Sequence, residues 1–146
     1  MTVSDWLFKS LPSDRVTPIF LTLGEVLAIH ESVIERYGGS LGVRELALLE
    51  SAVAMPQATF GGQYLHEDIP SMAAAYCFHL VANHPFVDGN KRVGAAAANV
   101  FLGMNGWELT ADQVAFADCV LNLASGRGDK QDTTVFFRQH STRMRL

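Results

Sequence analysis

The sequence predicts a single all-α domain. A chain of 146 residues has the usual length of one domain, and a 49% hydrophobic fraction is sufficient for one packed core. Alanine and leucine, both favourable in helices, are abundant, and apolar residues recur at helical spacing along most of the chain. Only residues 55–68 carry a pattern that suggests strands.

The composition also excludes several classes of protein. A net charge of −4 argues against direct nucleic-acid binding. Cys77 and Cys119 lie in apolar helical patterns, so we expect two buried, reduced thiols. The N-terminus lacks a basic start followed by an apolar block, and no apolar run approaches the ~20 residues that span a bilayer. We therefore expect a cytoplasmic protein without a membrane partner.

The predicted organisation is a leader at residues 1–20, a domain at residues 21–140 and a basic tail at residues 141–146. The leader is either loosely packed or docked on the core or on a partner, and the sequence leaves these alternatives open. Arg143 and Arg145 make the tail basic, and we expect it to be a solvated end.

The first half of the domain is predicted to contain two helices. Thr22 and Glu25 have the spacing of a capping box, so the first helix starts there and extends, with Tyr37 among its inward residues, to Gly38. A second helix is predicted over residues 42–54, with Leu46 facing inward. Residues 55–68 then contain two adjacent glycines between aromatic-bearing flanks, which suggests a short hairpin or flap, with a plain surface loop as the alternative.

The second half begins with a helix capped by Asp68 that is apolar nearly all round and should therefore be central. A helix over residues 90–105 follows, then an extended link, a helix capped by Thr110 and a final helix started by Asp132. Histidines in such patterns are usually core residues, and no role is assigned to the following four: His30, His66, His79 and His140.

A polar stretch connects the two central helices, and such a loop is a place to look for chemistry. Its residues are His84, Pro85, Phe86, Val87, Asp88, Gly89, Asn90, Lys91 and Arg92. Taken singly, each has an ordinary explanation, as a solvated side chain, a turn or a helix cap. Pro85 should favour extended backbone at His84, and Phe86 should anchor the loop in the core.

Taken together, these residues point to phosphate handling. Gly89 or Asn90 would cap the second helix, whose free N–H groups and dipole favour an anion. Lys91 and Arg92 in its first turn would add positive charge. Asp88 fits if Mg²⁺ lies between it and the phosphates. The remaining group, His84, is the candidate base, because histidine is the residue type best suited to proton transfer near neutral pH.

This stretch resembles the signature of the Fic/Doc superfamily, His-x-Phe-x-Asp/Glu-Gly-Asn-Gly/Lys-Arg. It is most similar to the death-on-curing (Doc) branch, in which Lys replaces the last Gly. Residues 34–39 and 101–106 also match that branch, and the resemblance covers residues 21–139. It implies a Fic-fold helical bundle with a central motif helix and a short flap. In the family the flap holds a target segment as an added strand, which would place the target on Thr59, Phe60, Gly61, Gly62, Gln63 and Tyr64.

The resemblance further implies transfer from ATP, with Mg²⁺, to a protein hydroxyl. Two chemistries compete, namely transfer of AMP and transfer of the γ-phosphoryl group. Lys91 in place of Gly, and Ala95 in place of a second Arg, favour the γ-phosphoryl. The implied catalytic residues are His84, Lys91 and Arg92, the nucleotide ligands are Gly89, Asn90, Lys91 and Arg92, and the metal ligand is Asp88.

By the same resemblance the target is a Thr or Ser of a translation protein, elongation factor Tu, and the protein is a toxin. Family members with an internal inhibitory helix carry Ser/Thr-x-x-x-Glu-Gly/Asn, and no glutamate of this chain precedes Gly or Asn. The implied restraint is therefore a separate, Phd-like antitoxin. A third interpretation is a degenerate binding module, against which the intact His84, Asp88, Asn90 and Arg92 argue.

Overall fold

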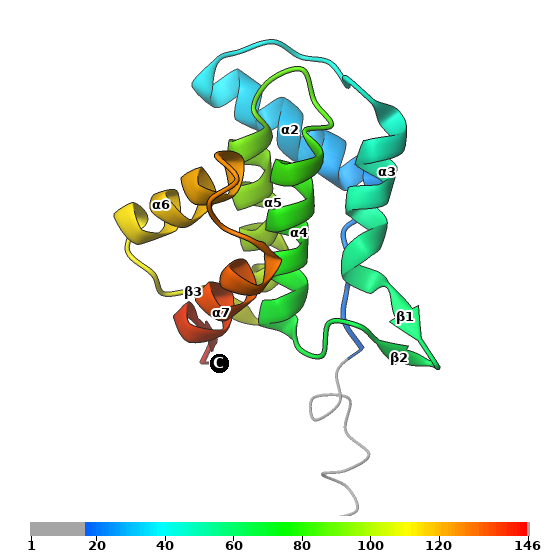
Figure 1. Ribbon diagram of the computed structural model, residues 1–146, viewed down its shortest axis with the longest axis vertical. Helices are drawn as coiled ribbons and strands as arrows, with labels where there is room; N and C mark the ends of the chain where they lie inside the picture. The colour runs from blue at the N-terminus through cyan, green and yellow to red at the C-terminus, as the bar shows by residue number, and fades with distance from the viewer. Residues whose placement is uncertain (1–16, 146) are drawn as a thin grey trace, which may run out of the picture.

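The computed structural model describes residues 17–145 and confirms the prediction of a mostly helical domain with a short hairpin (Figure 1). The described part contains six α-helices and two small antiparallel sheets. In chain order the elements are α2 (Leu23–Tyr37), α3 (Leu46–Ala54), the 3₁₀ turn η2 (Met55–Gln57), β1 (Thr59–Phe60), β2 (Gln63–Tyr64), α4 (Ile69–Asn83), α5 (Asn90–Met104), β3 (Trp107–Leu109), α6 (Gln113–Ala124), α7 (Lys130–His140) and β4 (Ser141–Arg143).

Helix α4 is the centre of the domain, as its all-round apolar pattern predicts. Every residue from Pro70 to Cys77 is buried, and Tyr76 is fully enclosed. Asp68 caps the helix by accepting from the backbone N–H of Ser71 at 2.8 Å. In Figure 1, α3 flanks one side of α4, α6 and α7 flank the other, and α2 crosses near the end where the α4–α5 loop lies.

Helix α5 packs closely against α4 because small residues line its inner face. A Cβ at Gly94 would lie 2.7 Å from Val81 and 3.1 Å from the Cys77 carbonyl oxygen, so only glycine permits this approach. Ala97 and Ala98 continue the close contact and are fully buried. This packing fixes the start of α5 relative to the end of α4, and therefore the loop between them.

The segment before α2 is tied to the core. Tyr76 Oη accepts from the backbone N–H of Leu21, and burial raises the pKa of Tyr76 to about 12. The side chain of Asn105 bonds both the N–H and the carbonyl of Ile19. The predicted capping box of Thr22 and Glu25 is confirmed. Residues 1–16 of the predicted leader lie outside the described part of the chain, and its boundary remains a prediction.

The predicted start of the second helix is wrong by four residues, since α3 begins at Leu46. Val43 forms a β-bridge with Phe86, and the N–H groups of Arg44 and Glu45 both donate to the Pro85 carbonyl. These contacts keep the backbone extended where residue spacing alone suggested a helix. Leu46, predicted to face inward, has 52% of its surface exposed.

Two more helix starts differ from the prediction. Asp112, not Thr110, caps α6, because the Thr110 hydroxyl donates to the carbonyl of His140. Asp129 caps α7, and Asp132 is the third helical residue of that capping box. The predicted solvated tail is also wrong in part, since Ser141–Arg143 pairs with Trp107–Leu109 as an antiparallel strand.

Cys77 is buried and Cys119 is half-buried, so the expectation of two buried thiols holds fully only for Cys77. Both are free, and burial raises the pKa of the Cys77 thiol well above its usual range. Within residues 17–145, none of the helices combines the length and hydropathy that crossing a membrane requires.

Candidate active site

The loop between α4 and α5, residues 84–89, is here called the motif loop. Phe86 is completely buried, which confirms its predicted role as the anchor. Gly89 is the N-cap of α5 and has a φ of 77°. This conformation favours glycine, and a Cβ at Gly89 would also lie only 3.1 Å from the end of the Ile34 side chain.

The prediction of extended backbone at His84 is wrong. His84 is the C-cap of α4 and adopts the left-handed conformation, with φ 51° and ψ 51°. The guanidinium of Arg44 donates to the carbonyls of Asn83 and His84, at 3.1 and 2.7 Å. These long-range contacts outweigh the local preference that Pro85 imposes on the residue before it.

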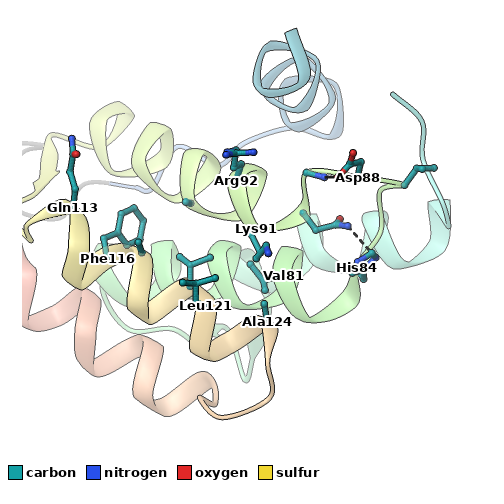
Figure 2. Close-up of a pocket in the computed structure, with 15 residues that line it drawn as sticks. Val81, His84, Asp88, Lys91, Arg92, Gln113, Phe116, Leu121 and Ala124 are labelled. Atoms are coloured by element: carbon teal, nitrogen blue, oxygen red, sulfur yellow. Dashed lines mark hydrogen bonds between the residues drawn. The ribbon is translucent and has the colours of Figure 1, made fainter. Parts of the chain in front are cut away.

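A cavity of about 810 Å³ opens beside the motif loop, between α5 and α6 (Figure 2). His84 and Asp88 lie at one end and Gln113 at the other, with Lys91 between them, directed towards α6. The wall formed by α6 is largely apolar and was not predicted from the sequence. Its residues are Phe116, Ala117, Val120, Leu121 and Ala124.

The start of α5 forms a positive end of this cavity. No side chain caps α5, whereas side chains of Thr22, Asp68, Asp112 and Asp129 cap four other helices. Among the described residues, no carboxylate lies within ion-pair distance of Lys91 or Arg92. Free N–H groups, the helix dipole and two cations without a carboxylate partner all favour an anion at this position.

The side chain of Arg92 is held by Tyr37, at the end of α2. Its guanidinium carbon lies 4.6 Å from the ring centroid of Tyr37, within the range of a cation–π contact. Tyr37, predicted to face the core, is instead 55% exposed and supports this arginine. Lys91 and Arg92 thus project in different directions, as Figure 2 shows, and flank the start of α5.

Asp88 is held by its backbone neighbours while remaining exposed. Its Oδ1 accepts from the N–H of Gly89 at 2.9 Å, and its Oδ2 accepts from the N–H of Ser40 at 3.2 Å. Gly39 has a φ of 115°, which favours glycine, and a Cβ there would lie 2.6 Å from Oδ2 and displace it. Asp88 is the one carboxylate among the described residues that line the cavity. A single carboxylate that retains free lone pairs suits Mg²⁺ that also binds phosphate.

Asn90, predicted to contact the nucleotide, directs its side chain into the protein. Its Oδ1 accepts from the N–H of Phe86 at 2.9 Å, and its Nδ2 donates to the Phe86 carbonyl at 3.0 Å. The same Nδ2 lies 3.1 Å from Nδ1 of His84. The side chain therefore fixes the motif loop and the His84 ring, which leaves only the backbone N–H of Asn90 available to a ligand.

His30 is the residue that the sequence interpretation missed. It is buried on α2, and its Nε2 donates to the carbonyl of Asp88 at 2.7 Å. His30 shares the inner face of α2 with Val26, Val33 and Ile34. This spacing could have indicated that its imidazole is buried and needs a hydrogen-bond partner. Nothing in the sequence indicated that this partner would be the motif loop.

The predicted hairpin is present, since Thr59 pairs with Tyr64 and Phe60 with Gln63 around Gly61 and Gly62. However, it lies at the opposite end of α4 from the motif loop (Figure 1). The 15 residues of α4 span about 22 Å. The docking of a target on Thr59–Tyr64 remains a prediction, and a segment held there would lie at the far end of α4 from His84.

Residues 38–45, the α2–α3 loop, border the motif loop instead. The N–H of Val87 donates to the carbonyl of Gly42, in addition to the bridge from Val43 to Phe86. Four exposed apolar side chains on these segments and on the first residue of α3 form what we term the apolar rim: Leu41, Val43, Leu46 and Val87.

Comparisons with known proteins find a matching family and similar proteins. The model of the Fic/DOC family matches residues 20–102. Toxin Doc of Mycolicibacterium smegmatis (strain ATCC 700084 / mc(2)155) is 43% identical over 97 residues, which cover 59% of this chain and 75% of the relative. Protein kinase doc of Escherichia phage P1 is 30% identical over 102 residues, which cover 70% of this chain and 79% of the relative.

Proposed function

Because this chain belongs to the Fic/Doc family, we propose that it is a toxin that acts as a protein kinase, transferring the γ-phosphoryl group of ATP to a serine or threonine hydroxyl. One observation carries the proposal. The positive start of α5, with its unpaired Lys91 and Arg92, opens into the same cavity as His84 and Asp88. Phosphoryl transfer needs such an arrangement, because it depends mainly on positioning and on neutralising charge.

The transfer forms a bond between the target oxygen and the γ-phosphorus and breaks the bond from that phosphorus to the bridging oxygen, so that ADP leaves. His84 accepts the proton of the hydroxyl. Because Nδ2 of Asn90 donates to Nδ1, a neutral His84 ring carries its own proton on Nε2. The basic lone pair of the ring is then on Nδ1, where it already accepts from Asn90, so the target hydroxyl must displace that amide before His84 can take its proton.

Lys91, Arg92 and the backbone N–H groups at the start of α5 bind and neutralise the phosphates. Arg92 offers a planar fork of donors and Lys91 a mobile charge. Asp88 is the residue that would hold Mg²⁺, which when bound offsets the charge of the triphosphate.

Two features favour γ-phosphoryl transfer over AMP transfer. Ala95, one turn beyond Arg92, lines the cavity and offers no second guanidinium for a terminal phosphate. Lys91 places its side chain inside the cavity, where glycine would leave a passage (Figure 2). The relative from phage P1 is, moreover, named a protein kinase.

The proposed target is elongation factor Tu, and the proposed location is the cytoplasm, where translation takes place. The proposed restraint is a Phd-like antitoxin in trans, in keeping with the name of the M. smegmatis relative. We assign first contact with the target protein to the apolar rim, because it is continuous with the motif loop that carries His84 and Asp88.

The experiment that tests the reaction uses ATP labelled at the α or the γ phosphate, purified elongation factor Tu and Mg²⁺. Transfer of label from the γ position alone supports the kinase, and transfer from the α position shows AMP transfer. ATP binding without labelling of any protein in a bacterial lysate would instead support the degenerate module. Mass spectrometry of the labelled protein then identifies the acceptor residue.

A further inference from the structure

The backbone conformation of His84 requires a specific support. Among residues 17–145, His84 is the one residue other than glycine with a positive φ, at 51°. A side chain in this conformation is strained and persists only where its surroundings fix it. Pro85, the next residue, restricts His84 further. The candidate base therefore does not hold its place through local preference.

The guanidinium of Arg44 supplies that support from the α2–α3 loop. Its Nε donates to the carbonyl of His84 at 2.7 Å and its Nη2 to the carbonyl of Asn83 at 3.1 Å. These are carbonyls at the end of α4, which lack helical partners and lie at the negative end of the helix dipole. A planar fork can bond two successive carbonyls at once, whereas an ammonium group is a point charge without this geometry.

The backbone of the same loop is fixed independently of this side chain. The N–H groups of Arg44 and Glu45 donate to the carbonyl of Pro85 at 2.7 and 3.1 Å, and Val43 bridges to Phe86. Shortening the side chain of Arg44 leaves these contacts in place. The loop can thus remain docked while His84 loses its support.

Arg44 does not act by touching the substrate. It is absent from the residues that line the cavity, and 45% of its side chain is exposed. Its ion pair with Glu45, at 3.6 Å, is exposed on both sides and contributes little. The two carbonyl contacts are the contacts that connect it to the site.

We propose that Arg44 is a positioning residue for phosphoryl transfer, whose guanidinium holds His84 in the left-handed conformation that directs the imidazole into the cavity. The inference rests on the proposed function. Arg44→Ala is expected to lower kcat by about 10–100-fold, the effect of a small misplacement of a reacting group. The KM for ATP should stay unchanged, because Lys91, Arg92 and Asp88 are untouched.

The test compares Arg44→Ala, Arg44→Lys and Glu45→Gln in steady-state transfer assays. Glu45→Gln removes the ion pair but keeps both carbonyl contacts, and should match the wild type. Arg44→Lys should be intermediate. Added guanidinium chloride should partly restore Arg44→Ala, whereas equal sodium chloride should not. A wild-type kcat in Arg44→Ala, or a changed KM alone, would overturn the proposal.

A second measurement separates this inference from the proposed reaction. Nitrogen NMR of ¹⁵N-histidine-labelled protein reports the His84 ring without any turnover, and His84→Ala assigns the signal. One sharp set of His84 signals is expected in the wild type and in Glu45→Gln, and a broadened or multiple set in Arg44→Ala. Identical His84 signals in all three proteins would refute the positioning role, whatever reaction the protein catalyses.

Discussion

The imidazole of His30 lies flat against the ring of Phe86, with centroids 3.7 Å apart and planes within 5°. The same imidazole donates to the carbonyl of Asp88. One side chain of α2 therefore supports both the buried anchor of the motif loop and the backbone of the candidate metal ligand. His30 also lies against Gly89, since a Cβ there would be 3.5 Å from Nε2.

Replacing His30 with phenylalanine should keep the stacking and lose the hydrogen bond. The Asp88 carbonyl would then lack its partner, and leaving such a group unsatisfied costs about 1–3 kcal/mol. We expect a lower melting temperature and a phosphoryl-transfer rate reduced by about tenfold. His140→Phe, on α7, is the matched control and should leave the rate unchanged. Wild-type transfer by His30→Phe would show that the hydrogen bond is dispensable.

His84→Ala should abolish modification without unfolding the protein. Loss of a general base typically lowers a rate by about 10²–10⁴-fold. The side chain is exposed, so its removal leaves the core unchanged. Transfer assays and thermal melting followed by circular dichroism provide the two readouts. Full activity in this variant would exclude His84 from the mechanism.

Asp88→Asn should weaken the dependence on Mg²⁺. The amide oxygen can still accept from Gly89 or Ser40, so the loop should keep its shape, but the charge that attracts the cation is lost. The Mg²⁺ concentration for half-maximal activity should rise by about 10–100-fold or more. Losing a residue that only hydrogen-bonds to a metal ligand already weakens metal binding by about this factor. Removing divalent ions with EDTA should stop the wild type, and Asp112→Asn should behave as wild type in the Mg²⁺ titration.

The apolar rim and the hairpin can be compared directly. Leu41 and Phe60 are 62% and 81% exposed, so replacing either with serine should change the folding free energy little. Leu41→Ser should raise the KM for the target protein and leave the KM for ATP unchanged. Phe60→Ser, in the hairpin at the opposite end of α4 from the motif loop, should change neither. A raised KM for the target protein in Phe60→Ser, with no change in Leu41→Ser, would identify the hairpin as the target-docking element.

His79 should make the folded protein sensitive to acid. Burial lowers its pKa to about 4, with Lys130 and His66 adding to the shift, and its Nε2 has no hydrogen-bond partner among the described residues. The unfolded chain binds a proton near pH 6.5 and the folded chain only near pH 4. Stability is therefore lost as pH falls between these values, by about 1–2 kcal/mol after a discount for solvent screening.

Denaturant unfolding of the wild type and of His79→Leu at several pH values between 7 and 4 measures this effect. The difference in unfolding free energy between the two proteins should shift in favour of the variant as the pH falls. A difference that does not change with pH would mean that His79 is protonated as readily in the folded chain as in the unfolded one.

The order of helices and the position of the motif were predictable because their signals are local. The caps at Thr22 and Asp68, the apolar face of α4 and the position of Gly89 depend on neighbours in the sequence. Phe86 stood out as an apolar residue within a polar run. The nine-residue motif was also interpretable from local sequence, because a base, a carboxylate and two cations follow one another at the start of a predicted helix.

The features that were missed depend on contacts between distant segments. Arg44 lies 40 positions from His84, and His30 lies 58 positions from Asp88. No local pattern indicates either pair. The delayed start of α3 and the left-handed His84 arise from the same contacts, since hydrogen bonds to the motif loop override local preference in both segments. The hairpin was predicted as a structure, but its distance from His84 follows from the length and direction of α4.

The two long walls of the cavity differ in how freely they can evolve. The α5 wall begins with the motif and is packed against α4 through Gly94, so few substitutions there are compatible with the fold. The α6 wall belongs to a helix with only Val120 and Leu123 buried, while Phe116, Leu121 and Ala124 face the cavity. Substitutions along α6 can therefore change which ligand the cavity prefers without changing the reacting groups on the motif loop and α5. Ligand selectivity and catalytic chemistry thus depend on different helices.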